Sequence, residues 1–199
     1  ASIMVASDVP VVAERSMYNK NRREGSCSIG APAPASDFYL SEGATGYKAG
    51  FTTWVLVQNP NNAETNVTLI FQTGTGQVAG PTFTMPANTR KTIKLNDYLP
   101  ANTDASTKVH GSKPLVAERA MYWDVGTGQC FHASIGLAEP HMTFMCPDGQ
   151  VGQALTYTLV ANPNPGAVTV RISYLPQGGG KTIRFTAEIP AESRATFNM

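Results

Sequence analysis

Hydrophobic and polar residues alternate at every second position over many short stretches of this chain. Residues 67–72 show the pattern, with valine, leucine and phenylalanine separated by threonine and isoleucine. A period of two places such residues on one face of a β-strand. Near-continuous apolar runs at 52–60 and 155–163 each stop at an Asn-Pro step, which opens a turn. No stretch carries the i, i+3, i+4 apolar spacing of an amphipathic helix, so we predict an all-β chain.

One nine-residue phrase occurs twice, as PVVAERSMY at 10–18 and as PLVAERAMY at 114–122. Over the aligned windows 1–18 and 105–122, ten of eighteen residues are identical. A match of this length at one offset indicates a duplicated unit of roughly 100 residues. The further matched segments are 37–43 with 143–149, 52–60 with 155–163, 67–72 with 168–174, and 83–93 with 187–197. Short strands at this spacing predict two Ig-like antiparallel β-sandwich repeats.

Two divisions of the chain into units fit the repeat. A simple tandem division gives 1–104 and 105–199. The other makes 37–137 a complete β-sandwich repeat and combines 1–36 with 138–199 into the second. We favour the second division, because it places unit boundaries in Pro-containing connections.

Those connections are 30–36, which contains two prolines, and 137–140. On this division, 138–199 lacks the strands predicted at 1–7 and 10–18, so its sheet would expose unpaired edges. Closure within the chain and strand donation from a neighbouring chain both remain open. Donation would run head to tail and would propagate a filament.

The composition gives little reason to expect a charged partner. Charged residues make up 15% of the chain, against a usual value of about 25%, and the formal net charge is +1. We therefore predict no nucleic-acid partner and, since no apolar run approaches ~18 residues, no membrane insertion. The basic run Lys-Asn-Arg-Arg at 20–23 has no interleaved aromatics and is interpreted as a hairpin tip. No signal peptide is visible, and the chain begins with strand-like sequence, as a mature product would.

The cysteines are Cys27, Cys130 and Cys146, an odd number. Low charge and an all-β pattern rich in threonine, glycine and proline suggest an extracellular protein, where disulfides persist. We predict a Cys130–Cys146 disulfide, because the two flank the same predicted strand. Cys27 would then be a free or interchain thiol. Three reduced thiols are the alternative.

Five motifs taken together point to a known kind of repeat. They are YLSEG at 39–43, TWVLVQNP at 53–60, MPANTR at 85–90, KPLVAERAMYW at 113–123 and ASIG at 133–136. The set resembles an uncharacterised tandem β-sandwich (Ig-like) repeat family of secreted and surface-attached prokaryotic proteins. The resemblance implies an extracellular, non-catalytic module and supports the division at 37–137. The second copy departs from the pattern at Cys146-Pro147 and at Tyr157, which replaces Trp54.

Adjacent acid–base pairs recur one repeat apart, as Glu14-Arg15 and Glu118-Arg119. A carboxylate in this position could be catalytic or could bind a ligand. We favour a structural role, because active sites are seldom duplicated intact. A charged side chain on a strand can anchor a neighbouring loop by hydrogen bonds. We predict that Arg15 and Arg119 hold the loops that connect strands.

We predict no catalytic residue, no cofactor site and no metal site. The nucleophile motif Gly-x-Ser-x-Gly is absent, and GGGKT at 178–182 lacks the first glycine of a phosphate-binding loop, so it is interpreted as a hairpin turn. Side chains with metal-binding chemistry are His110, His132, His141, Asp97, Asn102 and Asp104. The histidines lack metal-ligand spacing, and the other three fit no calcium loop.

These observations predict a non-catalytic structural or adhesive extracellular module. Strand complementation would make it a filament or surface-fibre subunit, whose partners are further copies of itself or surface glycans and proteins. We expect an extracellular or cell-surface location. The alternative is a carbohydrate-binding module, for which the aromatic candidates are Tyr47, Phe51, Tyr98 and Trp123. A hydrolase ranks third, because no paired carboxylates stand out.

Overall fold

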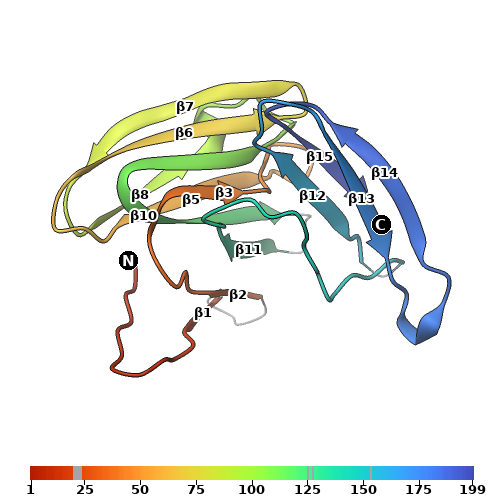
Figure 1. Cartoon of the computed structure of the whole chain (residues 1–199), viewed down its shortest axis with the longest axis horizontal. Coiled ribbons are helices and arrows are strands. Elements are labelled where there is room, and N and C mark those ends of the chain that lie inside the picture. Colours follow the sequence, from red (N-terminus) through yellow and green to blue (C-terminus); the bar gives the residue numbers. More distant parts are fainter. Residues whose placement is uncertain (20–23, 125, 127, 153) are drawn as a thin grey trace.

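The regular structure of the chain is β-strand. The computed structural model describes residues 1–199 except 20–23, 125, 127 and 153 (Figure 1). Within that part of the chain, the helical elements are two short 3-10 turns, η1 (Leu95–Asp97) and η2 (Gln177–Gly179). The strand pairings there are all antiparallel. The prediction of an all-β, antiparallel chain is therefore confirmed.

The strands are β1 (Glu14–Tyr18), β2 (Gly25–Ile29), β3 (Ala35–Leu40), β4 (Ala44–Thr45), β5 (Thr52–Asn59), β6 (Thr65–Thr73), β7 (Gly76–Met85), β8 (Thr89–Lys94), β9 (Thr103–Asp104), β10 (Ser106–Asp124), β11 (Gln129–Ile135), β12 (Tyr157–Asn162), β13 (Val168–Tyr174), β14 (Ile183–Ile189) and β15 (Ser193–Asn198).

Strand β10, which is 19 residues long, is the centre of the largest sheet. The order of that sheet is β7-β6-β10-β5-β8, and β3 and β11 also pair with β10. The first part of β10 lies between β6 and β3, and the part from Val116 onward lies between β5 and β11. Figure 1 shows β10 curling between these two groups of strands. One strand therefore connects two layers.

The core lies between these layers. Every second residue of β5 is buried, and so is every second residue over most of β6. Phe38, Leu69, Phe71 and Val109 are among the fully buried apolar side chains. Each such side chain contributes about 1.5–3 kcal/mol to folding when it is removed from water. The period-two burial follows the sequence pattern.

The beginning and the end of this body lie side by side. The Tyr39 N–H donates to the Leu137 carbonyl at 2.8 Å, and the Leu137 N–H donates to the Tyr39 carbonyl at 3.0 Å. We call residues 35–137 the first unit. Its strands on both sides of the core pair with β10.

Residues 138–199, which we call the second unit, form two separate ribbons. Strand β12 pairs with β15, and β13 pairs with β14. The buried apolar side chains of these ribbons are Ile172 and Ile189, among the residues described. The contacts between the units include an ion pair and a hydrogen bond: Arg194 Nη1 lies 3.2 Å from Asp104 Oδ2, and Gln72 Nε2 donates to the Asn162 carbonyl at 3.3 Å. Strand β15 also lies against β6 and β7.

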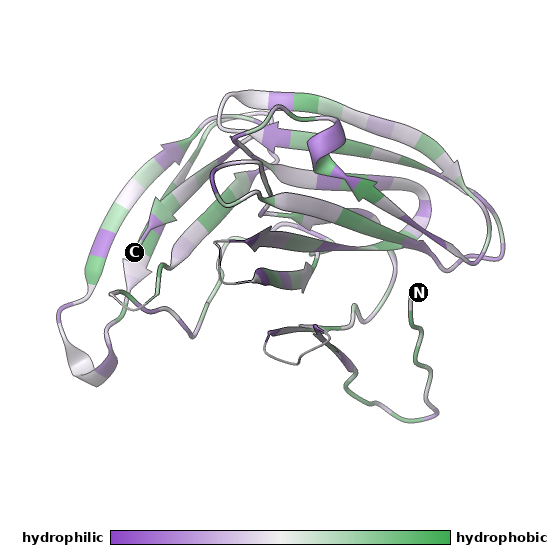
Figure 2. Cartoon of the chain, turned by 180° about the vertical axis from the view of Figure 1, so that it is seen from behind, coloured by the Kyte–Doolittle hydropathy of each residue, from purple (hydrophilic) through white to green (hydrophobic). Residues whose placement is uncertain are grey.

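The N-terminal segment differs from the sequence prediction. Strands were predicted at 1–7 and 10–18, but residues 1–13 form no strand and β1 begins at Glu14. Figure 2 shows hydrophobic residues along this segment, which runs clear of the main sheets. A strand needs a partner strand for its backbone groups, and within the described chain no strand pairs with residues 1–13, although the Gly30 N–H donates to the Ala13 carbonyl at 2.9 Å. The predicted hairpin tip at 20–23 lies outside the described residues.

Candidate functional site: an open sheet edge and its missing hairpin

Both units contain the same asparagine corner. In the first unit, Asn59 Nδ2 donates to the carbonyls of Ala63, Met85 and Pro86 at 3.0, 3.2 and 2.8 Å. In the second, Asn162 Nδ2 donates to three carbonyls at 2.9, 3.2 and 2.8 Å. Those carbonyls belong to Gly166, Ile189 and Pro190. From the sequence, the Asn-Pro steps predicted a turn, and this hydrogen-bonding role of the asparagine was not predicted.

The strands around each corner also correspond. The pairing of Asn59 with Thr89 in β5–β8 corresponds to that of Asn162 with Ser193 in β12–β15. Thr65 opposite Met85 in β6–β7 likewise corresponds to the first pair of β13–β14. The two ribbons of the second unit therefore match the two outer strand pairs of the first unit.

The second unit has no equivalent of the central strand. In the first unit β10 fills the space between β5 and β6. Between β12 and β13 the described chain places no strand, and each pairs on one side only. A strand that pairs on one side only presents backbone groups on its other side with which a further strand can pair. We call this side of β12 and β13 the open edge.

Side chains at equivalent positions show the effect of the missing strand. Phe38 is 1% exposed, whereas Phe144, its counterpart in the matched segments, is 58% exposed. Leu155, Tyr157 and Leu175 of the second unit are also exposed. The second unit thus leaves apolar side chains exposed where the first unit buries the corresponding Phe38.

The hairpin β1–β2 repeats the part of the fold that the second unit lacks. In β1–β2, Glu14 lies opposite Ile29 and Arg15 opposite Ser28. In β10–β11, the corresponding pairs are Glu118 with Ile135 and Arg119 with Ser134. The two hairpins therefore have the same register as well as the same sequence motif.

In this chain the β1–β2 hairpin lies beside β11 of the first unit. Ser26 Oγ accepts a hydrogen bond from the Ala133 N–H at 2.8 Å, and Ser28 Oγ accepts one from the Ile135 N–H at 3.0 Å. No ladder of backbone pairs joins β2 to β11 in the part of the chain described. Among the residues described, β1 and β2 pair with each other and with neither β12 nor β13. Closure within the chain and donation between chains both stay predictions.

The segment before this hairpin exposes apolar side chains. These are Ile3, Met4, Val5, Val9, Val11 and Val12. The segment aligns with 105–117, which includes Val109 and Leu115, and both of these are fully buried in the first unit. Apolar residues that are buried in the core of the first unit at 105–117 therefore have exposed counterparts in the N-terminal segment.

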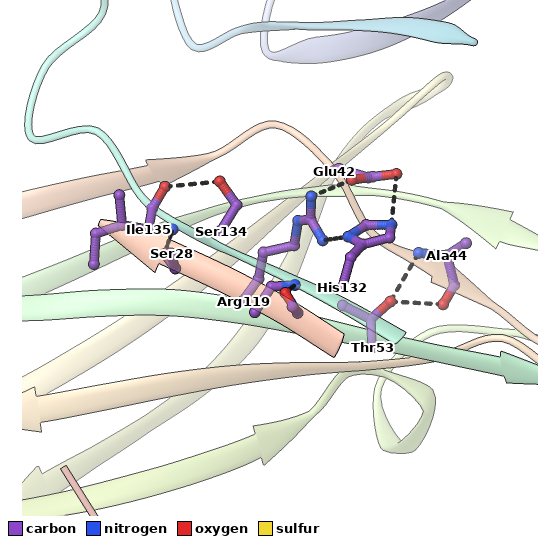
Figure 3. A network of polar contacts seen from close by, with 10 residues as sticks. Ser28, Glu42, Ala44, Thr53, Arg119, His132, Ser134 and Ile135 are labelled. Carbon is purple, nitrogen blue, oxygen red and sulfur yellow. Dashed lines mark hydrogen bonds and ion pairs between the residues drawn. The ribbon is translucent and has the colours of Figure 1, made fainter. Parts of the chain in front are cut away.

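Arg119 is the centre of a buried polar network. Its Nη2 donates to Glu42 Oε2, and its Nη1 lies 2.5 Å from His132 Nδ1 (Figure 3). His132 Nε2 lies 3.7 Å from Glu42 Oε1. Because a guanidinium can only donate, His132 Nδ1 accepts and the ring proton is on Nε2, which faces Glu42.

Burial affects the protonation of this network. Burial, and next the nearby Arg119 charge, lower the pKa of His132 below its ordinary value. Burial also lowers the pKa of Arg119, against the opposing effect of Glu42. An arginine nevertheless stays charged at physiological pH. The network is therefore a charged pair with a neutral histidine beside it.

The two predicted acid–base pairs have different surroundings. Arg119 contacts Glu42 in the loop between β3 and β4, as expected of a loop anchor. Arg15 Nη2 instead lies 2.5 Å from Glu118 Oε1, which is a strand residue of the other copy of the motif. Glu14 is exposed. The side chains of the two motifs thus contact each other, which the sequence did not indicate.

The three cysteines are free thiols in this structure. Cys130 Sγ lies 3.6 Å from Glu24 Oε1, and Cys146 is exposed in the segment before β12. The predicted Cys130–Cys146 disulfide is therefore not formed here. Cys27 is also exposed.

The residues considered for metal or phosphate binding do not gather into a site. The described part of the chain contains no group of three or more His, Cys, Asp or Glu side chains placed to hold a metal ion. His110 Nδ1 lies 2.9 Å from Asp37 Oδ1, and the His141 ring contacts Phe144. Asn102 Oδ1 accepts a bond from the Tyr47 N–H at 2.6 Å. Residues 178–182 connect the antiparallel strands β13 and β14, as a hairpin connection does.

Three of the four aromatic candidates come together. The ring centroids of Phe51 lie 6.3 Å from Tyr47 and 5.7 Å from Trp123. A shallow hollow of about 220 Å³ beside them is lined in part by Lys48, Trp123 and Asp124. The fourth candidate, Tyr98, packs on Phe71 elsewhere.

Comparison with known proteins assigns no family. No protein-family model matches the chain, and no curated protein is similar to it in sequence. The crystal structure of Thermotoga maritima 1070 overlaps 53% of this chain and 96% of its own, with a TM-score of 0.47 and 14% identity. The Anabaena sensory rhodopsin transducer overlaps 45% of this chain and 99% of its own, with a TM-score of 0.39 and 18% identity. Similarities this low indicate no function for this chain.

Among the residues that the structure describes, no helix has the length and hydrophobicity needed to span a bilayer.

Proposed function

We propose that this chain is a non-catalytic structural or adhesive extracellular module built from two Ig-like β-sandwich repeats, and that its copies join head to tail. In this proposal the N-terminal segment and the β1–β2 hairpin of one copy occupy the open edge of the next copy. Repetition of the contact gives a filament, because the donating and accepting surfaces lie on different parts of the chain.

The observation that carries the proposal is that the N-terminal segment repeats the sequence of the strand that the second unit lacks. The second unit lacks a strand between β12 and β13. Residues 1–18 repeat the sequence that forms that strand in the first unit. The same residues are largely exposed and, up to residue 13, have no strand partner in the described chain.

Strand addition would satisfy both surfaces at once. Backbone N–H and C=O groups of β12 and β13 would pair with those of the donated segment. Apolar side chains of the segment would cover those left exposed in the second unit, and burial of apolar area contributes about 25 cal/mol per Å². The unprotected sheet edges would also disappear.

Release of the hairpin from its own chain would cost little. Its contacts with the first unit include two hydrogen bonds to serine hydroxyls and the Arg15–Glu118 ion pair. Partly exposed ion pairs contribute about 0–1 kcal/mol. Addition of a segment of eighteen residues between two strands offers more contacts than this docking provides.

An extracellular location is supported by the composition and by the repeat resemblance. Low charge and many threonine, glycine and proline residues are consistent with a surface or secreted module. The five motifs resemble an uncharacterised repeat family of secreted and surface-attached prokaryotic proteins, which implies an extracellular, non-catalytic module.

Sedimentation velocity of the intact chain over a concentration series, with negative-stain electron microscopy, tests the proposal. We expect particles that lengthen with concentration and appear as unbranched filaments. A synthetic peptide of residues 1–29 should cap the open edge and shorten them, whereas a peptide of the same residues in scrambled order should not. A chain that stays monomeric at every concentration would refute the proposed assembly.

A carbohydrate-binding module is the second candidate, and the contact of Tyr47, Phe51 and Trp123 beside a shallow hollow favours it. Such aromatic faces pack on sugar rings through their apolar surface. A glycan array of the intact chain should then show binding that Trp123→Ala removes. An array without binding eliminates this candidate.

A further inference from the structure

We call the proposed contact between the N-terminal segment of one copy and the open edge of the next the joint. We infer that the joint forms in a single register, fixed by an ion pair between Arg15 of one copy and Asp148 of the next. This inference rests on the proposed head-to-tail assembly and names the residues that meet in it. Both sides of the joint have counterparts in the first unit, where their pairing is observed. The residue pairings observed in the first unit therefore predict, position by position, the residues that meet at the joint.

Three sequence offsets make the transfer possible. One of them, 106, relates 37–43 to 143–149, because the connection from this segment to the Asn-Pro step is three residues shorter in the second unit. The donated segment 1–18 aligns with 105–122 at an offset of 104. The accepting strands β12 and β13 align with β5 and β6 at an offset of 103. The matched corners at Asn59 and Asn162 establish this offset for β5, and the matched ribbon pairs establish it for β6.

On the β12 side, the transfer brings apolar residues together. In the first unit, Ala117 of β10 lies opposite Val57 of β5, and both are buried. The corresponding residues at the joint are Ala13 of one copy and Val160 of the next. Both therefore face the core of the completed second unit.

The same holds on the β13 side. Val109 lies opposite Leu69 in the first unit, and both are fully buried. Their counterparts are Val5 of the donor and Ile172 of the acceptor. Val5 is 61% exposed in the single chain, so insertion would remove most of its surface from water. The register thus keeps every second residue of the donor on the buried face.

The ion pair follows from the network around Arg119. Arg119 aligns with Arg15, and Glu42, its carboxylate partner, aligns with Asp148 in the matched segments of the two units. Asp148 is exposed and takes part in no ion pair among the residues described. Opposite charges therefore stand at the two positions where the first unit has a buried pair.

Assembly would exchange the partner of Arg15. In the single chain its Nη2 lies 2.5 Å from Glu118 Oε1 of the same chain. A hairpin inserted into the next copy leaves β11, so Arg15 exchanges Glu118 for Asp148. A slip of one residue would turn the apolar face outward, and a slip of two would move Arg15 about 7 Å from Asp148. The pair therefore distinguishes the correct register from slips that keep the same face buried.

Cysteine pairs test the register directly. Val116 lies opposite Gln58 in the first unit, on the outer face, so Val12 of one copy should lie opposite Ala161 of the next. With the native cysteines replaced by serine, Val12→Cys plus Ala161→Cys should give a ladder of disulfide-linked oligomers on a non-reducing gel. Opposed antiparallel residues have the Cα separation that a disulfide requires. Val12→Cys plus Leu159→Cys, two residues out of register on the same face, is the matched control and should give no ladder.

The outcomes separate the register from the assembly itself. Filaments in the microscope with no ladder, or with a ladder only in the Leu159 variant, would overturn the register and leave the proposed function standing. Absence of filaments would overturn both. A disulfide formed inside one chain, seen as an oxidised monomer band, would overturn donation between copies.

Charge reversal tests the ion pair. Arg15→Glu and Asp148→Arg should each weaken assembly by about tenfold, and the double variant should restore it. Arg15→Glu also breaks the contact with Glu118, which favours release of the hairpin, so weaker assembly must come from the joint. Glu118→Gln is the control and should strengthen assembly, since it removes the competing partner. Equal assembly of Arg15→Glu and the unaltered chain would refute the ion pair.

Discussion

The two units share their corners but not their cores. Asn59 and Asn162 each hold three carbonyls in the same arrangement. Phe38 is nevertheless buried, while its counterpart Phe144 is exposed. A corner needs only residues that are close in the sequence or in one ribbon. A closed core needs a strand that is distant in the sequence, and only the first unit has that strand in place.

The largest effect should come from truncation of the matched phenylalanines. Phe38→Ala removes a fully buried ring and should cost about 3–5 kcal/mol, a large part of the stability of a small domain. Phe144→Ala should cost less than about 0.5 kcal/mol in the unassembled chain, because its ring is mostly in solvent. Urea unfolding followed by the fluorescence of Trp54 and Trp123, both in the first unit, measures the first effect. Far-UV circular dichroism measures the second. Equal losses would mean that the second unit is closed.

Replacement of the two equivalent arginines should also give unequal results. Arg119→Leu leaves Glu42 largely buried without its partner and should cost on the order of 3 kcal/mol. Arg15→Leu affects a pair with about a quarter of its side-chain surface exposed and should cost about 1 kcal/mol or less. Thermal melts of the two variants compare them. An unchanged melting temperature for Arg119→Leu would contradict its role as a loop anchor.

Removal of the corner asparagines should give similar results in the two units. Asn59→Ala and Asn162→Ala each leave buried carbonyls without a donor, which costs about 1–3 kcal/mol. Because the bonds have nearly the same lengths in both, we expect similar local losses, measured by amide hydrogen exchange of the neighbouring strands. Asn61→Ala is a companion variant and should give a smaller loss, because it keeps the three carbonyl bonds of Asn59 and removes only the bonds from Asn61 Nδ2 to Asn59 Oδ1 and to the Pro114 carbonyl. A loss at Asn59 alone would mean that the second corner does not form.

The smallest effect should be a pH dependence confined to the first unit. Burial, and then Arg119, lower the pKa of His132 in the folded chain. Below pH ~6.5, histidine in the unfolded chain takes up a proton that folded His132 does not. The unfolded chain then binds more protons, so stability falls as the pH falls below that value. Melting temperatures measured from pH 7 to pH 5.5 should decline less steeply for His132→Gln.

Local features could be predicted from the sequence, whereas distant partners could not. The period-two pattern and the Asn-Pro steps indicated the strands, and the internal repeat indicated which segments correspond. The continuity of β10 through Gly111 and Pro114 was not predicted, because both residues usually interrupt a strand. Residues 112–114 have no backbone ladder partner among the residues described. Side chains of neighbouring segments hold this part of β10 instead: the Lys113 N–H donates to Thr65 Oγ1 at 3.0 Å, and Asn61 Nδ2 donates to the Pro114 carbonyl at 2.7 Å.

The candidate site shows the same limit. The repeat marked Arg15 and Arg119 as equivalent, but not that their partners would differ. Glu42 lies 77 positions from Arg119 in the sequence, and Glu118 lies 103 positions from Arg15. A strand was predicted at 1–7, and its residues have the right pattern. They form none in the single chain, because a pattern does not supply the hydrogen-bonding partner.

The bridge between Tyr39 and Leu137 has a mechanical consequence. The chain enters and leaves the first unit at this bridge, and its two strands are antiparallel. Tension applied through the two ends would therefore load its two hydrogen bonds in sequence, as in unzipping, rather than together in shear. These bonds should yield at low force and release a short length of chain while the core stays intact. A fibre made of such units would extend slightly under load and shorten again as these hydrogen bonds re-form.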